Sequence, residues 1–294
     1  MKIIIRQKSK YKNYKEKNFE HLLNQGLIIL NKEKGMTSRS FTRFLLDLGI
    51  KKAGHAGTLD PNTTGVLPVL INRGNKISSI LSLSKKEYLA TMYVHKEFDK
   101  KNLLNVFKNF TGEINQLVPK LSAVKRQVRK RNIYSIKLKS IKKQVVKFHV
   151  SCQAGTYIRK LIHDMGQDLG TGAHMIELER TKSGPYTLKN SLTKSEFLKL
   201  FNKKDKSAFF SLESAVKEIN KVWIDDGALE PWSKGSPIYF NGILKFTSDI
   251  KIGSKIAVFN QANELIGIGI SKANSSEFLN SKEGIAFRNH INLI

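Results

Sequence analysis

The 294-residue chain has one cysteine, no long hydrophobic run and few acidic side chains, and each shortage argues against a class of protein. With Cys152 alone, neither a disulfide framework nor a cysteine-based zinc site can form, which is typical of a reducing compartment such as the cytoplasm. No apolar run approaches the roughly 18 residues of a membrane-spanning helix, and the N-terminus is too polar for a signal peptide. The sequence therefore favours a cytoplasmic protein that does not enter a membrane.

Lysine and arginine outnumber aspartate and glutamate by 51 to 24, which gives a formal net charge of +27 and a pI near 10.0. Solubility requires far less positive charge, so a polyanion is the expected partner. A membrane surface would also attract this charge, but without a membrane segment nucleic acid is the leading candidate. Because lysine enrichment also arises from genomic drift, the charge indicates a class of partner and not individual contacts.

Hydrophobic residues make up 40% of the chain, and their spacing predicts both strands and helices. Strands are expected at 27–30, 65–71, 86–94 and 144–152, where apolar runs are short or alternate with polar residues. In the last of these strands the residues expected to face inward are Val146, Phe148, Val150 and Cys152. Helices are expected at 40–50, 100–110 and 157–169, where apolar residues recur at spacings of three and four. Leu104 is expected on the apolar face of the second of these helices. Because these elements follow no strict strand–helix–strand rhythm, the predicted fold class is α+β.

The distribution of lysine and of apolar runs along the chain predicts three segments. Residues 1–21 are rich in lysine without a sustained period and are interpreted as a basic N-terminal arm or loose edge segment. Residues 22–215 hold the expected strands and helices of a larger domain. From about Val222 onward short β-type runs prevail, with a hairpin-like turn at 260–264, so residues 220–294 are predicted to form a small β-rich domain.

The stretch KKAGHAGTLDPNTTGVLPVL, residues 51–70, places one aspartate among turn-forming residues. Turn chemistry alone explains the Asp, Pro, Asn and Gly of DPNTTG. Since Pro61 biases Asp60 toward extended geometry, its carboxylate is expected to project from a rigid loop, where reactive groups tend to lie. Both a structural and a catalytic role for Asp60 remain open on this evidence.

The segment CQAGTYIRKLIHDMGQDLG predicts a strand end followed by an amphipathic helix, with Thr156 as its cap. Arg159 lies off the apolar stripe and in the first turn, where a cation is disfavoured by about 0.3–1 kcal/mol at an exposed site. An anionic partner is therefore expected, and a carboxylate such as Asp60 or an RNA phosphate would serve. The alternative is an exposed arginine at a harmless position.

Other candidate residues carry weaker signals. Tyr88 is either an ordinary strand residue or a platform on which a base stacks, and the basic cluster 125–134 is either a solvated face or one that an anion covers. His55 has no ligand partner at metal-binding spacing, and His163 and His174 are likewise isolated, so no metal site is predicted. No Ser-His-Asp, Walker or dinucleotide pattern occurs.

Several segments together resemble the TruB/dyskerin family of RNA pseudouridine synthases. They are AGHAGTLDPNTTGVLPV, KEYLA, LSAVKRQVRKRNIY, AGTYIRKLIHDMGQDLGTGAHMIELERTKSGPY and KVWIDDGA. The resemblance runs in order from about Gly26 to Gly184 and continues through a tail similar to a PUA domain. It implies a mixed-sheet pseudouridine synthase catalytic domain over 22–215, a PUA RNA-binding domain over 220–294, and an isomerase that acts on uridine in tRNA or rRNA.

The resemblance also implies roles for individual residues. Asp60 would be the catalytic aspartate, as nucleophile or as base, Tyr88 the tyrosine that stacks on the target base, and Arg159 the arginine that pairs with the aspartate. Leu178 would form the apolar wall of the pocket, and His55 would lie against the RNA. In the family reaction the N-glycosidic bond breaks, uracil turns and C5 joins C1′, without a cofactor.

The branch of the family is indicated by the segments around the tyrosine strand. MYVHKEFDKKNLLNVF runs directly into a helix, without the insertion of bacterial members. SAVKRQVRKRNIY, whose Lys125 and Arg126 are expected to contact RNA, resembles the catalytic subunit of H/ACA ribonucleoproteins, which works with a guide RNA and small protein partners. Because the sequence ends at Ile294 without a eukaryotic lysine-rich extension, an archaeal-type protein is favoured, a branch also linked to uridine 55 of tRNA.

The sequence departs from the family pattern at two places. Asn31-Lys32-Glu33 stands where the family has Asp-Lys-Pro, and Val118-Pro119 where it has a double proline, which would alter how the first strand and the basic block meet RNA.

Three hypotheses for the function remain open. The protein is a guide-dependent synthase, a guide-independent synthase for tRNA uridine 55, or a catalytically silent RNA-binding scaffold of a ribonucleoprotein.

Overall fold

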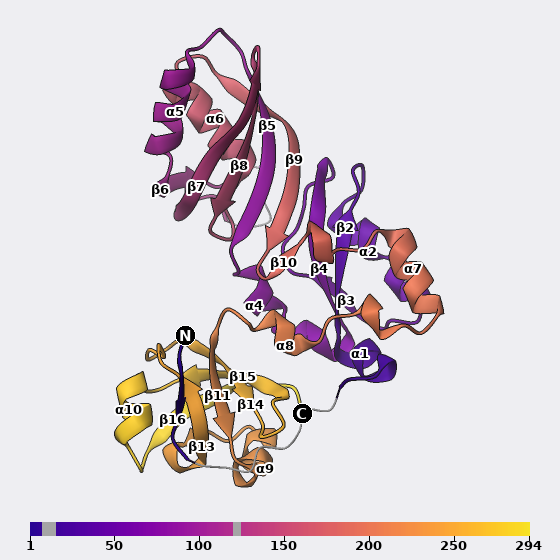
Figure 1. Cartoon of the computed structure of the whole chain (residues 1–294), viewed down its shortest axis with the longest axis vertical. Coiled ribbons are helices and arrows are strands. Elements are labelled where there is room, and N and C mark those ends of the chain that lie inside the picture. The colour runs from indigo at the N-terminus through magenta and orange to yellow at the C-terminus, as the bar shows by residue number, and fades with distance from the viewer. Residues whose placement is uncertain (8–15, 120–124) are drawn as a thin grey trace. The chain divides into compact units, whose positions relative to one another are not determined.

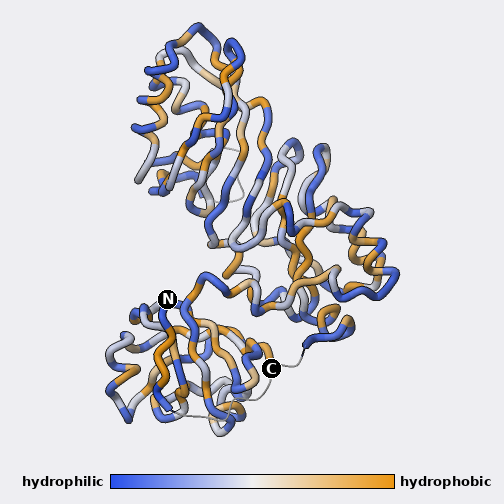
Figure 2. Tube along the Cα trace, viewed as in Figure 1, coloured by the Kyte–Doolittle hydropathy of each residue, from blue (hydrophilic) through white to orange (hydrophobic). Residues whose placement is uncertain are grey.

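The computed structural model describes residues 1–7, 16–119 and 125–294, and these form two compact units. The central unit comprises residues 28–69 and 79–203, and the terminal unit comprises residues 1–27, 70–78 and 204–294. Figure 2 shows hydrophobic and hydrophilic residues interleaved along the strands and helices of both units. No helix among the described residues is long and apolar enough to cross a bilayer.

A mixed sheet in the order β2-β4-β9-β5-β8-β7-β6 organises the central unit, with β3 on β4 and β10 on β9 (Figure 1). β4 pairs with β9 in parallel, whereas β5, β6, β7, β8 and β9 pair antiparallel, as a mixed α+β fold requires. The strands are β2 (Leu27–Lys32), β3 (Ala53–His55), β4 (Thr63–Ile71), β5 (Lys86–Val94), β6 (Gly112–Leu117), β7 (Val128–Lys142), β8 (Val145–Cys152), β9 (Ala173–Ser183) and β10 (Tyr186–Thr187).

Alternation along β5 and β8 gives the sheet one face covered by helices and one free of them. Tyr88 lies opposite Val150 and Ala90 opposite Phe148, and Phe148 packs on Phe107 of α5 (Lys100–Asn109) with ring centroids 5.2 Å apart. α6 (Ile158–Asp168) lies beside α5 and buries its apolar stripe (Figure 1). The predicted inward residues of β8 are confirmed, because Val146, Phe148, Val150 and Cys152 are all buried.

Three local predictions for the helices are wrong in detail. The helix expected at 40–50 is split into α2 (Ser38–Thr42) and α3 (Phe44–Asp47), and Gly49, with φ +81°, lies just beyond the end of α3. Leu104, expected on the buried face of α5, is 43% exposed. Thr156 does not cap α6: its hydroxyl donates to the carbonyl of Gln153, and Tyr157 occupies the position before the helix.

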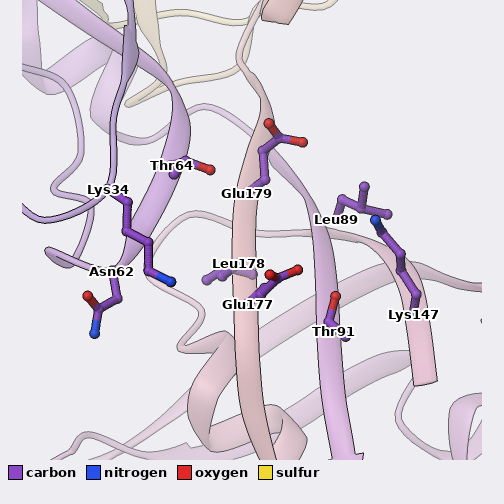
Figure 3. Close-up of a pocket in the computed structure, with 9 residues that line it drawn as sticks. All are labelled: Lys34, Asn62, Thr64, Leu89, Thr91, Lys147, Glu177, Leu178 and Glu179. Carbon is purple, nitrogen blue, oxygen red and sulfur yellow. The ribbon is translucent and has the colours of Figure 1, made fainter. Parts of the chain in front are cut away.

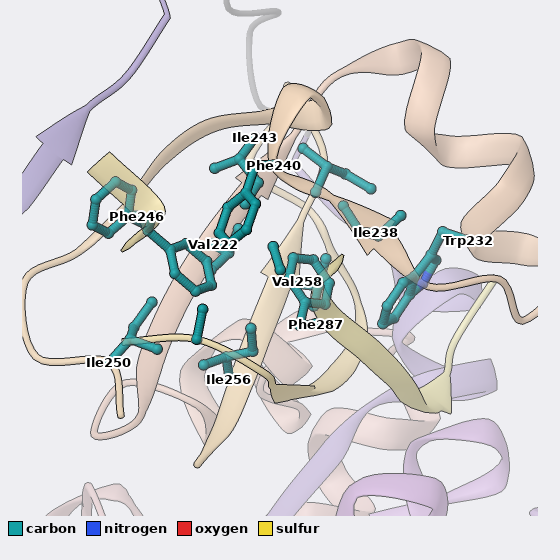
Figure 4. Close-up of a cluster of buried hydrophobic side chains, with 14 of the residues drawn as sticks. Val222, Trp232, Ile238, Phe240, Ile243, Phe246, Ile250, Ile256, Val258 and Phe287 are labelled. Atoms are coloured by element: carbon teal, nitrogen blue, oxygen red, sulfur yellow. The ribbon is translucent and has the colours of Figure 1, made fainter. Parts of the chain in front are cut away.

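The terminal unit is built on a second sheet, in the order β1-β13-β11-β14-β15-β16-β12. Its strands are β1 (Ile3–Ile5), β11 (Asn220–Ile224), β12 (Ile238–Tyr239), β13 (Ile243–Thr247), β14 (Lys255–Phe259), β15 (Leu265–Ser271) and β16 (Ile285–Asn292). Figure 4 shows its apolar core, in which Trp232 packs edge-on against Phe287. The hairpin turn expected at 260–264 joins β14 to β15.

The remaining helices lie in the segments between successive strands. They are α1 (Phe19–Gln25), η1 (Asn72–Ile77), α4 (Ser78–Ser82), η2 (Leu188–Asn190), α7 (Lys194–Asn202), η3 (Lys206–Ala208), α8 (Leu212–Ala215), η4 (Asp226–Ala228), α9 (Leu229–Ser233), η5 (Phe240–Gly242) and α10 (Ser275–Asn280). Of the segment 1–21 expected as a basic arm, residues 3–5 form the edge strand β1 on β13, residues 19–21 begin α1, and residues 8–15 lie outside the described part of the chain.

Candidate active site

A tight turn between β3 and β4 carries Asp60. The Thr63 amide donates to the Asp60 carbonyl at 2.9 Å, and the Gly35 amide donates to the Pro61 carbonyl at 2.9 Å. Ser38 clamps the same turn, because its hydroxyl donates to the Leu59 carbonyl at 3.0 Å and accepts from the Leu59 amide at 2.8 Å. Backbone groups are thus held on both sides of Asp60, while its carboxylate is exposed.

Lys32, at the end of β2, is fully buried beneath this turn. Its ammonium group donates to the carbonyls of Glu33, Pro61 and Thr63 at 2.7, 3.1 and 2.9 Å. Burial lowers the pKa of Lys32, and the negative charge of Asp60 opposes that fall. In the sequence analysis Lys32 appeared only as part of an altered motif. The available signal was a lysine at the end of a strand whose first four residues, 27–30, are apolar.

Arg159 meets Asp60 at the start of α6. Its Nη2 atom lies 2.5 Å from Oδ2 of Asp60, and the two side chains are 58% and 53% exposed. The anionic partner expected for an arginine in the first turn of this helix is therefore Asp60, about a hundred residues earlier. An exposed pair of this kind contributes little to stability.

Tyr88 lies on the helix-covered face of β5, with 9% of its surface exposed. Burial raises the pKa of Tyr88, the positive charge of Arg180 opposes this, and the negative charge of Asp60 adds to it. The phenol therefore stays protonated and lies within electrostatic reach of Asp60.

Arg180, which the sequence analysis missed, is directly opposite Tyr88 in the pairing of β5 with β9 and is only 1% exposed. Its guanidinium donates to the carbonyls of Val66 at 2.7 Å and Gly57 at 2.9 Å. Burial lowers the pKa of Arg180, and its interaction with Tyr88 opposes that fall. The available signal was a charged residue at an inward position of the alternating strand MIELERTKS.

Leu178 lies two residues before Arg180 on β9 and pairs with Thr63, so it borders the Asp60 turn. A cavity of about 240 Å³ lies beside it, and Figure 3 shows the lining residues Lys34, Asn62, Thr64, Leu89, Thr91, Lys147, Glu177, Leu178 and Glu179. Most of these alternate with Tyr88 and Arg180 and so point to the helix-free face. Asp60, Tyr88 and Arg159 do not line this cavity, which we therefore keep separate from the candidate active site.

Among the described residues, none of the three predicted RNA-contact residues forms a hydrogen bond or ion pair with Asp60. His55 ends β3 and is half-buried; burial lowers its pKa, with a further contribution from the charge of Arg180 that a backbone hydrogen bond opposes. Lys125 and Arg126 are exposed and directly follow residues 120–124, which lie outside the described part of the chain.

The histidines predicted to be isolated are not. His174 Nδ1 lies 2.8 Å from His95 Nε2, and His163 Nδ1 lies 3.3 Å from Asp164 Oδ1. The contact between His95 and His174 was not predicted because the two residues are 79 residues apart and meet only where β5 ends and β9 begins. No group of three metal-ligating side chains occurs within residues 1–7, 16–119 and 125–294.

Comparison with known protein families covers nearly the whole chain. Residues 46–158 match the model of the TruB family pseudouridylate synthase N-terminal domain, residues 159–222 match the tRNA pseudouridylate synthase B C-terminal domain, and residues 220–291 match the PUA domain. The chain therefore has a TruB-type catalytic domain followed by a PUA domain.

Individual relatives agree. A probable tRNA pseudouridine synthase B of Nanoarchaeum equitans is 41% identical over 91% of this chain and 79% of its own length, and that of Methanocaldococcus jannaschii is 36% identical over 92% and 83%. A chain of a Cbf5-Nop10-Gar1 complex superposes with a TM-score of 0.94, at 33% identity over 100% of this chain and 94% of its own. A chain of an H/ACA ribonucleoprotein bound to a substrate RNA gives 0.91 at 32% identity, with the same coverage. This protein belongs to the TruB/dyskerin family of pseudouridine synthases, which are isomerases.

Proposed function

We propose that this protein isomerises uridine to pseudouridine within structured RNA and that Asp60 is its catalytic carboxylate. The observation that supports this most is the contact between Asp60 of a loop and Arg159 of a helix in a member of this family. Tyr88, on a strand of the same unit, lies within electrostatic reach of Asp60. The reaction breaks the bond between C1′ and N1, joins C1′ to C5, and moves one hydrogen from C5 to N1.

The residue types suit this chemistry. Asp60 must be ionised to attack C1′ as nucleophile or to take a proton from C2′ as base, and the Arg159 guanidinium stabilises the carboxylate. A target base flipped out of folded RNA loses its stacking, which the ring of Tyr88 and the apolar side chain of Leu178 would offset. Tyr88 and Leu178 share one face of the sheet, next to the Asp60 turn.

RNA would be held by positive charge on both units. The net charge of +27 supplies the attraction, and we assign Lys125, Arg126 and His55 to contacts with RNA around the site. The PUA domain would add a second contact. Binding should therefore weaken steeply as salt rises, because each neutralised phosphate releases counterions.

For the substrate we propose tRNA uridine 55, guide-directed rRNA sites, or both. The relatives are named tRNA pseudouridine synthase B, and the matching structures are H/ACA assemblies, one with Nop10 and Gar1 and one with a substrate RNA. Pseudouridine formation in unmodified tRNA, with and without guide RNA and small H/ACA proteins, separates the two modes. Efficient, site-specific activity of the protein alone would refute strict guide dependence.

The catalytic assignment is tested by Asp60→Asn, which keeps the size of the side chain and removes its charge. We expect no detectable pseudouridine with unchanged RNA affinity. Asp47→Asn, at an exposed position of α3, is the matched control and should behave as the parent. An Asp60→Asn variant as active as the parent would refute the assignment, and a parent that binds RNA without modifying it would indicate a silent scaffold.

A further inference from the structure

Gln116 is the one buried side chain of β6, the strand at one end of the central sheet. The other residues of β6 are exposed or half-buried, whereas Gln116 is only 2% exposed. Glutamine is mostly a surface residue, and a buried carboxamide is tolerated where its polar atoms are hydrogen-bonded. An apolar side chain would fill this position without the cost of desolvating polar atoms, so the carboxamide calls for a role besides burial.

Both polar atoms of Gln116 bind the backbone of Tyr157, the residue before α6. Nε2 donates to the Tyr157 carbonyl at 3.1 Å, and Oε1 accepts from the Tyr157 amide at 3.0 Å. The carboxamide therefore pairs with the extended backbone of Tyr157 as a neighbouring strand would. The same carbonyl accepts the first hydrogen bond of the helix, from the Leu161 amide at 2.9 Å. Gln116 thus fixes the residue at which α6 begins.

The turn before Tyr157 is attached to β7 by similar contacts. Arg131 Nε donates to the Gly155 carbonyl at 3.1 Å. The Gln153 amide donates to the Asn132 carbonyl at 2.8 Å, and the Asn132 amide donates to Gln153 Oε1 at 3.0 Å. The turn is therefore fixed by β7 and the residue after it by β6, so that the sheet positions the start of α6.

The position of this helix start determines where Arg159 can reach. Arg159 lies two residues after Tyr157 and contacts Asp60, but both side chains of the pair are more than half exposed. An exposed ion pair contributes little to stability, so other contacts must fix the two backbones that carry it. The turn of Asp60 is fixed by Lys32 beneath it. On the side of Arg159 the corresponding contact is that of Gln116.

We propose that Gln116 is a positioning residue for pseudouridine formation, which holds the start of α6 through the backbone of Tyr157 so that Arg159 meets the Asp60 carboxylate. The inference rests on the proposed function and deepens it, because it adds a buried residue that acts without touching RNA. A displacement of about 1 Å in an active site can lower a rate about 100-fold. Loss of this contact should therefore lower the rate in the bound complex and not the affinity for RNA.

Gln116→Glu tests the two hydrogen bonds, because a protonated carboxyl group has the donor and the acceptor of a carboxamide, whereas an ionised one only accepts. Burial raises the pKa of the introduced carboxyl group above its ordinary value of about 4.3. The assay is single-turnover pseudouridine formation at saturating RNA between pH 5 and pH 8.5, in the format in which the parent is active. The rate relative to the parent should be within about threefold at pH 5 and fall at least about tenfold by pH 8.5.

Gln116→Met removes both hydrogen bonds at a similar side-chain length. We expect the saturating rate to fall about tenfold at every pH, with RNA affinity changed less than about threefold. In an Arg159→Ala background the same substitution should change the rate less than about twofold, because the side chain that Gln116 positions is absent. Asn115→Met, at the exposed neighbouring position of β6, is the matched control and should keep the parent rate. Phe197→Leu, buried in α7, is the control for lost stability and should also keep the saturating rate.

Three results would overturn the inference: a rate of Gln116→Glu relative to the parent that does not change with pH, a Gln116→Met variant with the parent rate, or fully additive losses in the Arg159→Ala background. Either variant of Gln116 decides the question if the other does not fold. Parent and Asp60→Asn, run alongside, distinguish these results from failure of the proposed function. An inactive parent refutes both, whereas an Asp60→Asn variant as active as the parent refutes the catalytic assignment.

Discussion

The interiors of the two units differ in what they bury. The central unit encloses three cationic side chains, Lys32, Lys86 and Arg180, each hydrogen-bonded to backbone carbonyls. The core of the terminal unit is apolar, and its buried polar side chains among the described residues are only Thr247 and Ser271. Two sheets of similar size in one chain thus follow different rules of packing.

The difference reflects what each unit must hold in place. An apolar core stabilises a sheet through burial alone, without fixing the direction of any one polar group. Buried ammonium and guanidinium groups cost desolvation, but they tie carbonyls of separate segments at defined distances. Lys32 and Arg180 both hydrogen-bond the backbone around Asp60. The central unit is therefore less stable than an apolar interior would make it, but the short turn has a defined geometry.

Lys32→Met should have the largest effect on this difference between the two units, because it replaces a cationic side chain inside the central unit with an apolar one. Three carbonyls would lose their donor, at about 1–3 kcal/mol each if they stay dry, and the turn of Asp60 would loosen. We expect the chain to unfold at lower denaturant and pseudouridine formation to fall at least about tenfold at saturating RNA. The exposed Lys51→Met is the control; parent-like activity in Lys32→Met would contradict the anchoring role.

Trp232→Ala tests the apolar core of the terminal unit. The side chain is fully buried against Phe287, so its loss should destabilise the terminal unit by about 3–5 kcal/mol. Chemical denaturation followed by the fluorescence of the remaining Trp223 measures this. RNA affinity should fall while the rate at saturating RNA stays within about twofold; a tenfold loss of that rate would show that the terminal unit shapes the active site.

A matched pair of glycines sharpens the comparison. Gly65→Ala forces a Cβ against the Arg180 backbone at φ +103°, whereas Gly253→Ala, at φ +78° in the terminal unit, meets nothing within 4 Å. We expect Gly253→Ala to cost about 1 kcal/mol of unfolding free energy, from backbone strain alone, and Gly65→Ala clearly more. If denaturant titrations gave the same loss of unfolding free energy for both variants, the backbone of β9 at Arg180 would shift to accommodate the new Cβ at little cost.

The smallest expected effect concerns pH. Burial raises the pKa of Cys152 from 9.0 to about 12, so the thiol ionises in the unfolded chain first. Its contribution to stability is fully present below pH 9 and is lost as pH rises toward 12, by about 1 kcal/mol between pH 8 and pH 10. Urea titrations at both pH values should show this decrease in unfolding free energy for the parent and no such decrease for Cys152→Ala. The same decrease in both proteins would indicate that the thiol is accessible to water.

The sequence predicted those parts of the site that local rules constrain. Asp60 stood out in its turn, and Arg159 stood out because a cation in a first helical turn lacks an anion. Lys32 and Arg180 could not be assigned, since their partners are backbone carbonyls, which every residue has, and only the pairing of β4, β5 and β9 selects among them. The split of the helix at 38–47 and the exposure of Leu104 likewise depend on tertiary packing, which periodicity does not encode.

Both tryptophans, Trp223 and Trp232, belong to the terminal unit, and the single cysteine, Cys152, is buried in the central unit. The chain therefore carries a natural two-channel reporter: indole emission follows the opening of one unit, and the rate of thiol alkylation follows the opening of the other. Their order along a denaturant or temperature ramp can be read in a single unlabelled sample, without any substitution, and it tells whether the units melt together or one after the other.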